Sequence, residues 1–115
     1  TLSLHDALPI LLHHGPVRSD TPADAYGDAV RLACGNALAA ARGMLAPDES
    51  LAAILSLTVY VAAEPGFVAH SRIADLASAH LRAELGEAGI GCRAAVGVAS
   101  LPGNAPVEIQ LVAAV

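Results

Sequence analysis

The chain has 115 residues, a formal net charge of −5 and a hydrophobic fraction of 55%. This length is typical of one domain, and the negative charge excludes the electrostatic attraction that drives binding to a nucleic-acid backbone. No apolar run reaches the roughly 20 residues of a membrane-spanning helix, and no basic segment typical of a signal peptide opens the chain, so we expect a cytoplasmic protein.

The core must be built from small aliphatic side chains, because only two tyrosines and one phenylalanine are aromatic. A short and apolar chain of this kind is expected to bury further surface by oligomerising. Cys34 and Cys92 are isolated and form no CxxC pair. This favours free thiols in a reducing compartment, where both are expected to be small core residues.

The first residues differ in character from the rest of the chain. Thr1–Ile10 resembles translated adapter sequence, and we expect residues 1–14 to be a non-native, disordered or edge segment; a native edge strand is the alternative. The adjacent His13 and His14 lack further ligands, so they do not predict a metal site. Residues 15–115 are expected to form a single domain.

A first helix is predicted from Thr21 to about Leu45. Thr21 can cap it, and Pro22 suits the first helical position. The three- and four-residue spacing of apolar positions predicts an inner face made of Ala29, Leu32, Ala33, Asn36, Ala37, Ala40 and Met44. Close packing on a sheet would account for the three glycines of this helix, which are Gly27, Gly35 and Gly43.

Residues 51–62 alternate as a strand does, and residues 71–85 follow with helical spacing. In the strand, one face is predicted to carry Leu55, Leu57, Val59 and Val61. In the second helix, the inner face is predicted to carry Ile73, Leu76, Ala77, Leu81 and Leu85.

The last 25 residues contain two apolar runs that flank the turn 102–104, a pattern that predicts a β-hairpin. Each run carries one charge, Arg93 in the first and Glu108 in the second. A charge in such a strand must face a cleft, a partner or water, because burial without a partner is costly. We expect Arg93 to point away from the helices, with Cys92, Val96 and Val98 toward them.

The order helix, strand, helix, strand, strand predicts an α+β fold, in which a sheet carries two helices on one face. The opposite face would then be small and nearly uncharged. Such a face indicates an interface with the sheets of other subunits.

The C-terminal residues also resemble a known family. Arg93–Pro102 followed by Val107–Ile109 resembles the C-terminal signature of the RidA/YjgF reactive-intermediate deaminases. Further stretches resemble the same family in the same order, including a branch described as endoribonuclease-like: Ala33–Leu38, Leu57–Val61, Pro65–Phe67, Ala77-Ser78 and Leu85–Glu87. The resemblance covers about residues 15–115.

This resemblance implies a chorismate-mutase-like fold and a homotrimer with clefts between subunits. It implies hydrolysis of a small 2-imino or enamine acid to a 2-oxo acid and ammonia, without metal or organic cofactor and without a nucleic-acid or membrane partner. Arg93 would bind the substrate carboxylate, and Glu108 would orient water. Phe67 and Asp75 are further candidates for lining the substrate cleft.

The chain departs from the family pattern in three ways. The first strands of the family are absent or replaced by residues 1–14, Asp75 stands where the second helix usually has asparagine, and Ala95 replaces a frequent cysteine. Substrate scope is therefore open.

Each candidate residue also has a structural alternative. Arg93 and Glu108 could form an inter-subunit salt bridge, Glu108 could bond only backbone, Asp75 could be a solvated helix residue, and Phe67 could be a packing anchor. The alternative function is a non-catalytic trimer that binds small carboxylates, whereas ribonuclease activity is disfavoured by the acidic charge.

Overall fold

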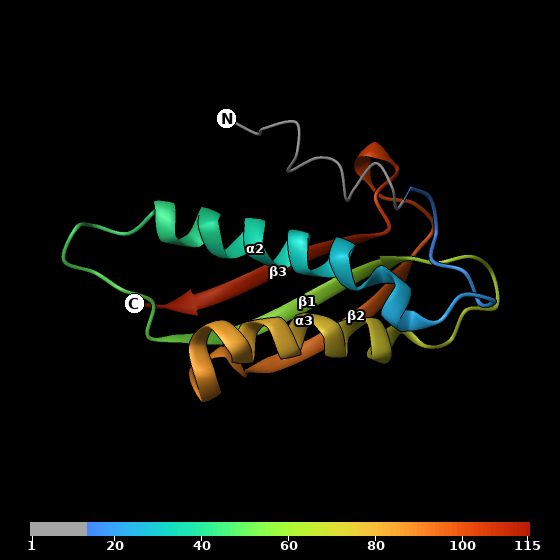
Figure 1. The fold of residues 1–115 in the computed structure, drawn as a ribbon. Coiled ribbons are helices and arrows are strands. Elements are labelled where there is room, and N and C mark those ends of the chain that lie inside the picture. The colour runs from blue at the N-terminus through green and yellow to red at the C-terminus, as the bar shows by residue number, and fades with distance from the viewer. Residues whose placement is uncertain (1–13) are drawn as a thin grey trace.

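The computed structural model describes residues 14–115 (Figure 1). The 3₁₀ turn η1 spans Ala23–Tyr26, and the α-helices α2 and α3 span Gly27–Gly43 and His70–Leu85. The strands β1, β2 and β3 span Ala53–Ala62, Cys92–Val98 and Val107–Ala114, and two short 3₁₀ turns, η2 and η3, span Gly86–Gly89 and Pro102–Asn104. The interpretation of residues 1–14 falls, except for His14, outside the described residues.

The three strands form one mixed sheet in the order β2-β1-β3, with β1 parallel to β2 and antiparallel to β3. Parallel neighbours need a crossover connection, and α3 supplies it between β1 and β2. Figure 1 shows α2 and α3 on the same face of the sheet, with α2 over β3 and α3 over β1 and β2. The expectation of an α+β sheet covered by two helices on one face is confirmed.

The predicted β-hairpin is wrong, because β1 lies between β2 and β3. The turn itself exists: Gly103 and Asn104 both have positive φ. However, eight residues separate Val98 from Val107, far more than the two of a tight hairpin. This length lets β3 reach the other edge of β1, where α2 covers Ile109. If β3 instead paired with the free edge of β2, Ile109 would have no helix above it.

The central strand supplies the middle of the core. Leu57, Val59 and Val61 are buried beneath the helices, as their alternation predicts. Leu55 breaks the pattern and is 52% exposed, while Ile54 is buried. A register irregularity between Ile54 and Ser56 causes this exchange, because a bulge shifts the alternation by one residue.

The inner face of α3 is confirmed, whereas that of α2 is rotated relative to the prediction. In α3, Ile73, Ala77 and Leu81 are fully buried. In α2, the buried stripe is made of Ala29, Val30, Cys34 and Leu38, and both Asn36 and Met44 are exposed. The glycines of α2 do not mark close packing on the sheet: a Cβ at Gly35 or Gly43 would meet nothing within 4 Å, and one at Gly27 would meet only the Arg31 side chain.

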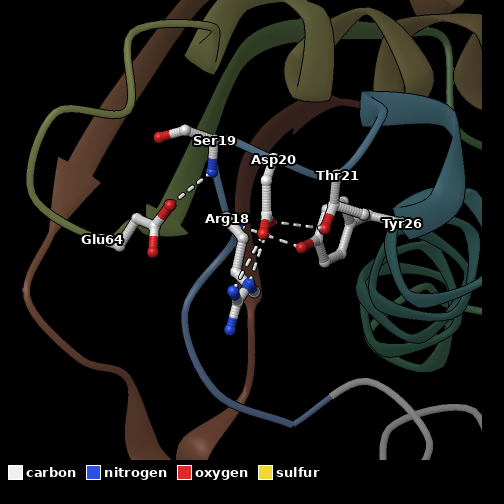
Figure 2. A network of polar contacts seen from close by, with 6 residues as sticks. All are labelled: Arg18, Ser19, Asp20, Thr21, Tyr26 and Glu64. Atoms are coloured by element: carbon white, nitrogen blue, oxygen red, sulfur yellow. Dashed lines mark hydrogen bonds and ion pairs between the residues drawn. The ribbon is translucent and has the colours of Figure 1, made fainter.

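A polar network fastens the segment before η1 to the end of β1 (Figure 2). The backbone N–H of Arg18 donates to the Tyr26 hydroxyl at 3.0 Å, and the backbone N–H of Ser19 donates to the Glu64 carboxylate. The Arg18 guanidinium holds both carboxylate oxygens of Asp20, which lowers the pKa of Asp20 to about 2. Thr21 donates to Asp20 instead of capping the helix, so the predicted cap is not formed.

Candidate functional site

Arg93 lies in β2 and reaches across to α3. Its Nη1 donates to Asp75 Oδ1 at 2.8 Å and to Ser78 Oγ at 3.2 Å. Asp75 and Ser78 are three residues apart in α3, which places both side chains on one face of the helix. The helix therefore presents an anion and a hydroxyl to one guanidinium.

The Arg93 side chain is 30% exposed and that of Asp75 is 66% exposed. An ion pair as open to water as this one contributes only about 0.2–1 kcal/mol to folding. The ion pair itself therefore contributes little to the stability of the domain.

A cavity of about 390 Å³ opens beside this pair. Its polar lining comes from Asp75, Ser78, Arg82 and Arg93, and the rest of its wall from Leu57, Ala79, Gly89, Ile90 and Gly91. The lining contains two arginines and one aspartate, and Arg82 is itself paired through Nε with Glu87 at 3.3 Å, which leaves Arg93 as the guanidinium available to a ligand. Such a cavity is suited to a small anion, because a guanidinium binds a carboxylate through paired hydrogen bonds.

Arg93 retains donors for a ligand. Both of its hydrogen bonds to residues 14–115 use Nη1, and none of them uses Nε or Nη2. A bidentate contact to a carboxylate requires two such N–H groups side by side. The fork formed by Nε and Nη2 can therefore receive a carboxylate while Asp75 stays in place.

The prediction that Arg93 points away from the helices is wrong. Arg93 is in register with the buried Leu57 of β1, and in a parallel pair such neighbours share a face. Cys92 and Val96 consequently lie on the opposite, outer face, where Cys92 is exposed and Val96 is 38% exposed. Alternation predicts two faces, but it does not say which of them the helices cover.

The four predicted site residues lie in three separate places. Arg93 and Asp75 meet in the cavity. Glu108 is in register with Tyr60 on the outer face, so the sheet lies between it and the Arg93 guanidinium within one chain. Phe67 lines a different cavity. Its ring contacts that of His70 edge to face at a centroid distance of 5.1 Å and is partly buried against the core, as expected of a packing anchor.

Ser78 and Arg82 were not predicted as site residues. Together with Asp75 they occupy positions i, i+3 and i+7 of α3, a spacing that puts them on one stripe of the helix. The sequence shows this polar stripe next to the apolar stripe of Ile73, Ala77 and Leu81. It could not be connected to Arg93 without knowing which face of β2 the helix covers.

The two cysteines behave differently. Cys34 is fully buried, its Sγ lies 3.7 Å from the Ala77 carbonyl oxygen, and burial raises its pKa to about 11. Cys92 is exposed, so the expectation that it is a core residue is wrong. Both thiols are free.

The other features of the described chain offer less chemistry. A larger cavity of about 540 Å³ lies between α2 and β3, but its polar lining residues are only Glu49 and Gln110, so it offers no cationic side chain to an anionic ligand. No cluster of metal-binding side chains occurs within residues 14–115. Over the same residues, no helix is long and apolar enough to cross a bilayer.

Comparison with solved structures relates this fold to two bacterial proteins. A protein of unknown function from Agrobacterium tumefaciens is 36% identical, with a TM-score of 0.79 over 87% of this chain and 64% of its own. A protein from Shewanella oneidensis, described as a candidate endoribonuclease, is 26% identical, with a TM-score of 0.81 over 91% of this chain and 70% of its own. No family model and no curated protein matches the sequence.

The chain thus spans a little less than two thirds of the Agrobacterium protein, and its described residues follow the same path as the corresponding part of both structures. The shared architecture is an α+β sheet with two helices on one face. The comparisons are consistent with the RidA-like fold that the sequence resemblance implies.

Proposed function

We propose that the protein is a hydrolytic deaminase of small 2-imino or enamine carboxylic acids, producing 2-oxo acids and ammonia. The observation that carries this proposal is the half-buried Arg93 guanidinium, which faces a cavity of suitable size and keeps a donor fork open. An imine hydrolyses in water without help, so holding it by its carboxylate beside a positioned water can supply much of the acceleration. The resemblance of Arg93–Pro102 to the deaminase signature supports this choice of substrate class.

The role proposed for Glu108 requires a second subunit. Within one chain the sheet separates Glu108 from Arg93, so a water-orienting Glu108 would have to come from a neighbouring protomer. The outer face of the sheet supports assembly, because it exposes Leu55, Val96 and Val112 at 52%, 38% and 51%. A homotrimer that buries this face is part of the proposal.

The test compares ammonia or 2-oxo acid release from freshly generated 2-iminobutanoate with and without the protein. The wild type should accelerate release over the uncatalysed rate, and Arg93→Ala should abolish the acceleration. Arg31→Ala is the matched control, because Arg31 also pairs with an aspartate across one turn but lines no cavity beside Arg93. An active Arg93→Ala variant would refute the proposal.

A non-catalytic role is the first alternative: the same cavity would bind a small carboxylate without turning it over. Binding of 2-oxobutanoate that depends on Arg93, together with no acceleration of imine hydrolysis by an intact oligomer, would favour it. Size-exclusion chromatography with light scattering establishes whether the oligomer is intact.

Ribonuclease activity is the second alternative, favoured by the description of the Shewanella structure. Against it stands the formal charge of −5, with six arginines and no lysine in the whole chain. RNA cleavage that persists in Arg93→Ala after repeated purification would favour this alternative.

A further inference from the structure

The cavity beside Arg93 has an apolar wall as well as a polar one. Its polar side chains come from Arg93 and from one stripe of α3, whereas Leu57, Ala79 and Ile90 contribute hydrocarbon. Ile90 is 38% exposed, so part of its side chain remains uncovered in the cavity lining. One available cation next to an apolar wall suits an acid that carries a hydrocarbon side chain.

The apolar wall lies to one side of the guanidinium along the strand. His70, the first residue of α3, packs beside Gly97, and Ser78 bonds Arg93, so α3 runs antiparallel to β2. The segment Gly89–Gly91 precedes β2, and it therefore lies beyond Arg93 toward the C-terminal end of α3. A ligand held at Arg93 can extend toward this segment within the same cavity.

The segment that carries Ile90 is held in place by backbone packing. A Cβ at Gly89 would collide with the carbonyl group of Leu81, and one at Gly91 would collide with carbonyl oxygens of β1. The backbone N–H of Ile90 also donates to the Glu87 carbonyl oxygen at 3.1 Å. Because this wall is already ordered, a ligand that packs on Ile90 does not have to order the segment, which keeps the entropic cost of binding low.

Arg82 lines the same cavity and raises the alternative of a ligand with a second acidic group. Its Nε is paired with Glu87 at 3.3 Å, so a carboxylate of its own charge already accompanies it. A second carboxylate on the ligand would have to compete with Glu87, whereas a hydrocarbon chain at Ile90 displaces only water, which is favourable. The lining therefore favours a monocarboxylic acid with an apolar side chain.

We propose that Ile90 sets the selectivity of the Arg93 site for acids with an apolar side chain, and that side chains long enough to reach Ile90 are preferred. As a statement about substrates, this inference rests on the proposed function. Burial of one methylene group raises affinity by about fourfold. Two added methylenes should therefore favour 2-oxohexanoate over 2-oxobutanoate by up to about 15-fold.

The test measures dissociation constants of 2-oxobutanoate, 2-oxopentanoate and 2-oxohexanoate by isothermal titration calorimetry. We expect the affinity of the wild type to rise along this series, and Ile90→Ala to lose most of the rise while it binds 2-oxobutanoate as before. Val68→Ala is the matched control, because Val68 is also an exposed aliphatic residue but lines a different cavity. Ala79→Leu, which fills the apolar wall from α3, should weaken binding of 2-oxohexanoate selectively and serves if Ile90→Ala does not fold.

The outcomes separate this inference from the proposed function. A dependence on chain length that Ile90→Ala removes and Val68→Ala retains supports it. An equal dependence in the wild type and Ile90→Ala overturns it, as does tighter binding of 2-oxoglutarate than of 2-oxohexanoate, which would assign Arg82 to a second carboxylate.

Turnover of the corresponding imines completes the comparison. Hydrolysis by the wild type without any preference for the longer chain overturns the inference and leaves the deaminase proposal standing. Selective binding without turnover removes the deaminase proposal and leaves Ile90 as the selectivity residue of a carboxylate-binding site. Absence of both binding and turnover overturns the two proposals together.

Discussion

A single methyl group added at Gly91 should disturb the start of β2 more than its size suggests. Gly91 precedes the strand by one residue, and a Cβ there would lie 2.3 Å from the Ile54 carbonyl oxygen and 2.7 Å from the Leu55 carbonyl oxygen. Both are backbone atoms beside the bulge of β1, so they cannot rotate away as a side chain would. Gly91→Ala therefore forces β1 and β2 apart.

The expected size of the effect follows from this contact. Overpacking of a closely fitted site costs about 1–3 kcal/mol, which in a domain of this length should lower Tm by roughly 5–15 °C. Gly35→Ala is the matched control of opposite sign. A Cβ at Gly35 would meet nothing within 4 Å, and alanine is favoured over glycine inside a helix by about 0.5–1 kcal/mol.

Thermal unfolding followed by circular dichroism measures both variants under identical conditions. We expect Gly91→Ala to melt below the wild type and Gly35→Ala to melt at or above it. If Gly91→Ala melts within 1–2 °C of Gly35→Ala, the approach between Gly91 and the β1 carbonyls is not the constraint that we infer. Since Gly91 lies two residues before Arg93, Gly91→Ala should also weaken binding of 2-oxobutanoate.

Three further predictions concern buried side chains. Leu81 is fully buried between α3 and the sheet, so Leu81→Ala should lower the free energy of unfolding in urea by about 3–5 kcal/mol, whereas a loss under 1 kcal/mol would contradict this packing. In thiol titration at pH 8, Cys34 should react only after unfolding, because it is buried and burial raises its pKa to about 11. A raised pKa in the folded state contributes stability that is present below the unfolded pKa of about 8.5 and is lost as pH rises toward 11. Wild-type stability should therefore decline over that range more than that of Cys34→Ala, and equal declines would count against a desolvated thiol.

Much of the secondary structure could be predicted from local pattern. The spacing of Ile73, Ala77 and Leu81 specified one helix and its inner face, and the alternation of Leu57 with Val59 specified a strand. These patterns succeed because they depend on the periods of a helix and a strand, which are properties of the backbone alone. In α2 the abundance of alanine weakened the pattern, since nearly every face of that helix is apolar, and the predicted stripe was rotated.

The site required tertiary information. The charges in β2 and β3 singled out Arg93 and Glu108, but sequence alternation could not say that the two strands are separated by β1 or that their charges lie on opposite faces. That outcome depends on which strand edge lies beneath which helix, a choice made by burial between segments far apart in the chain. Asp75 shows the same division: the sequence determined its place on a helix, and only the packing of α3 on β2 brought its carboxylate to the guanidinium of Arg93.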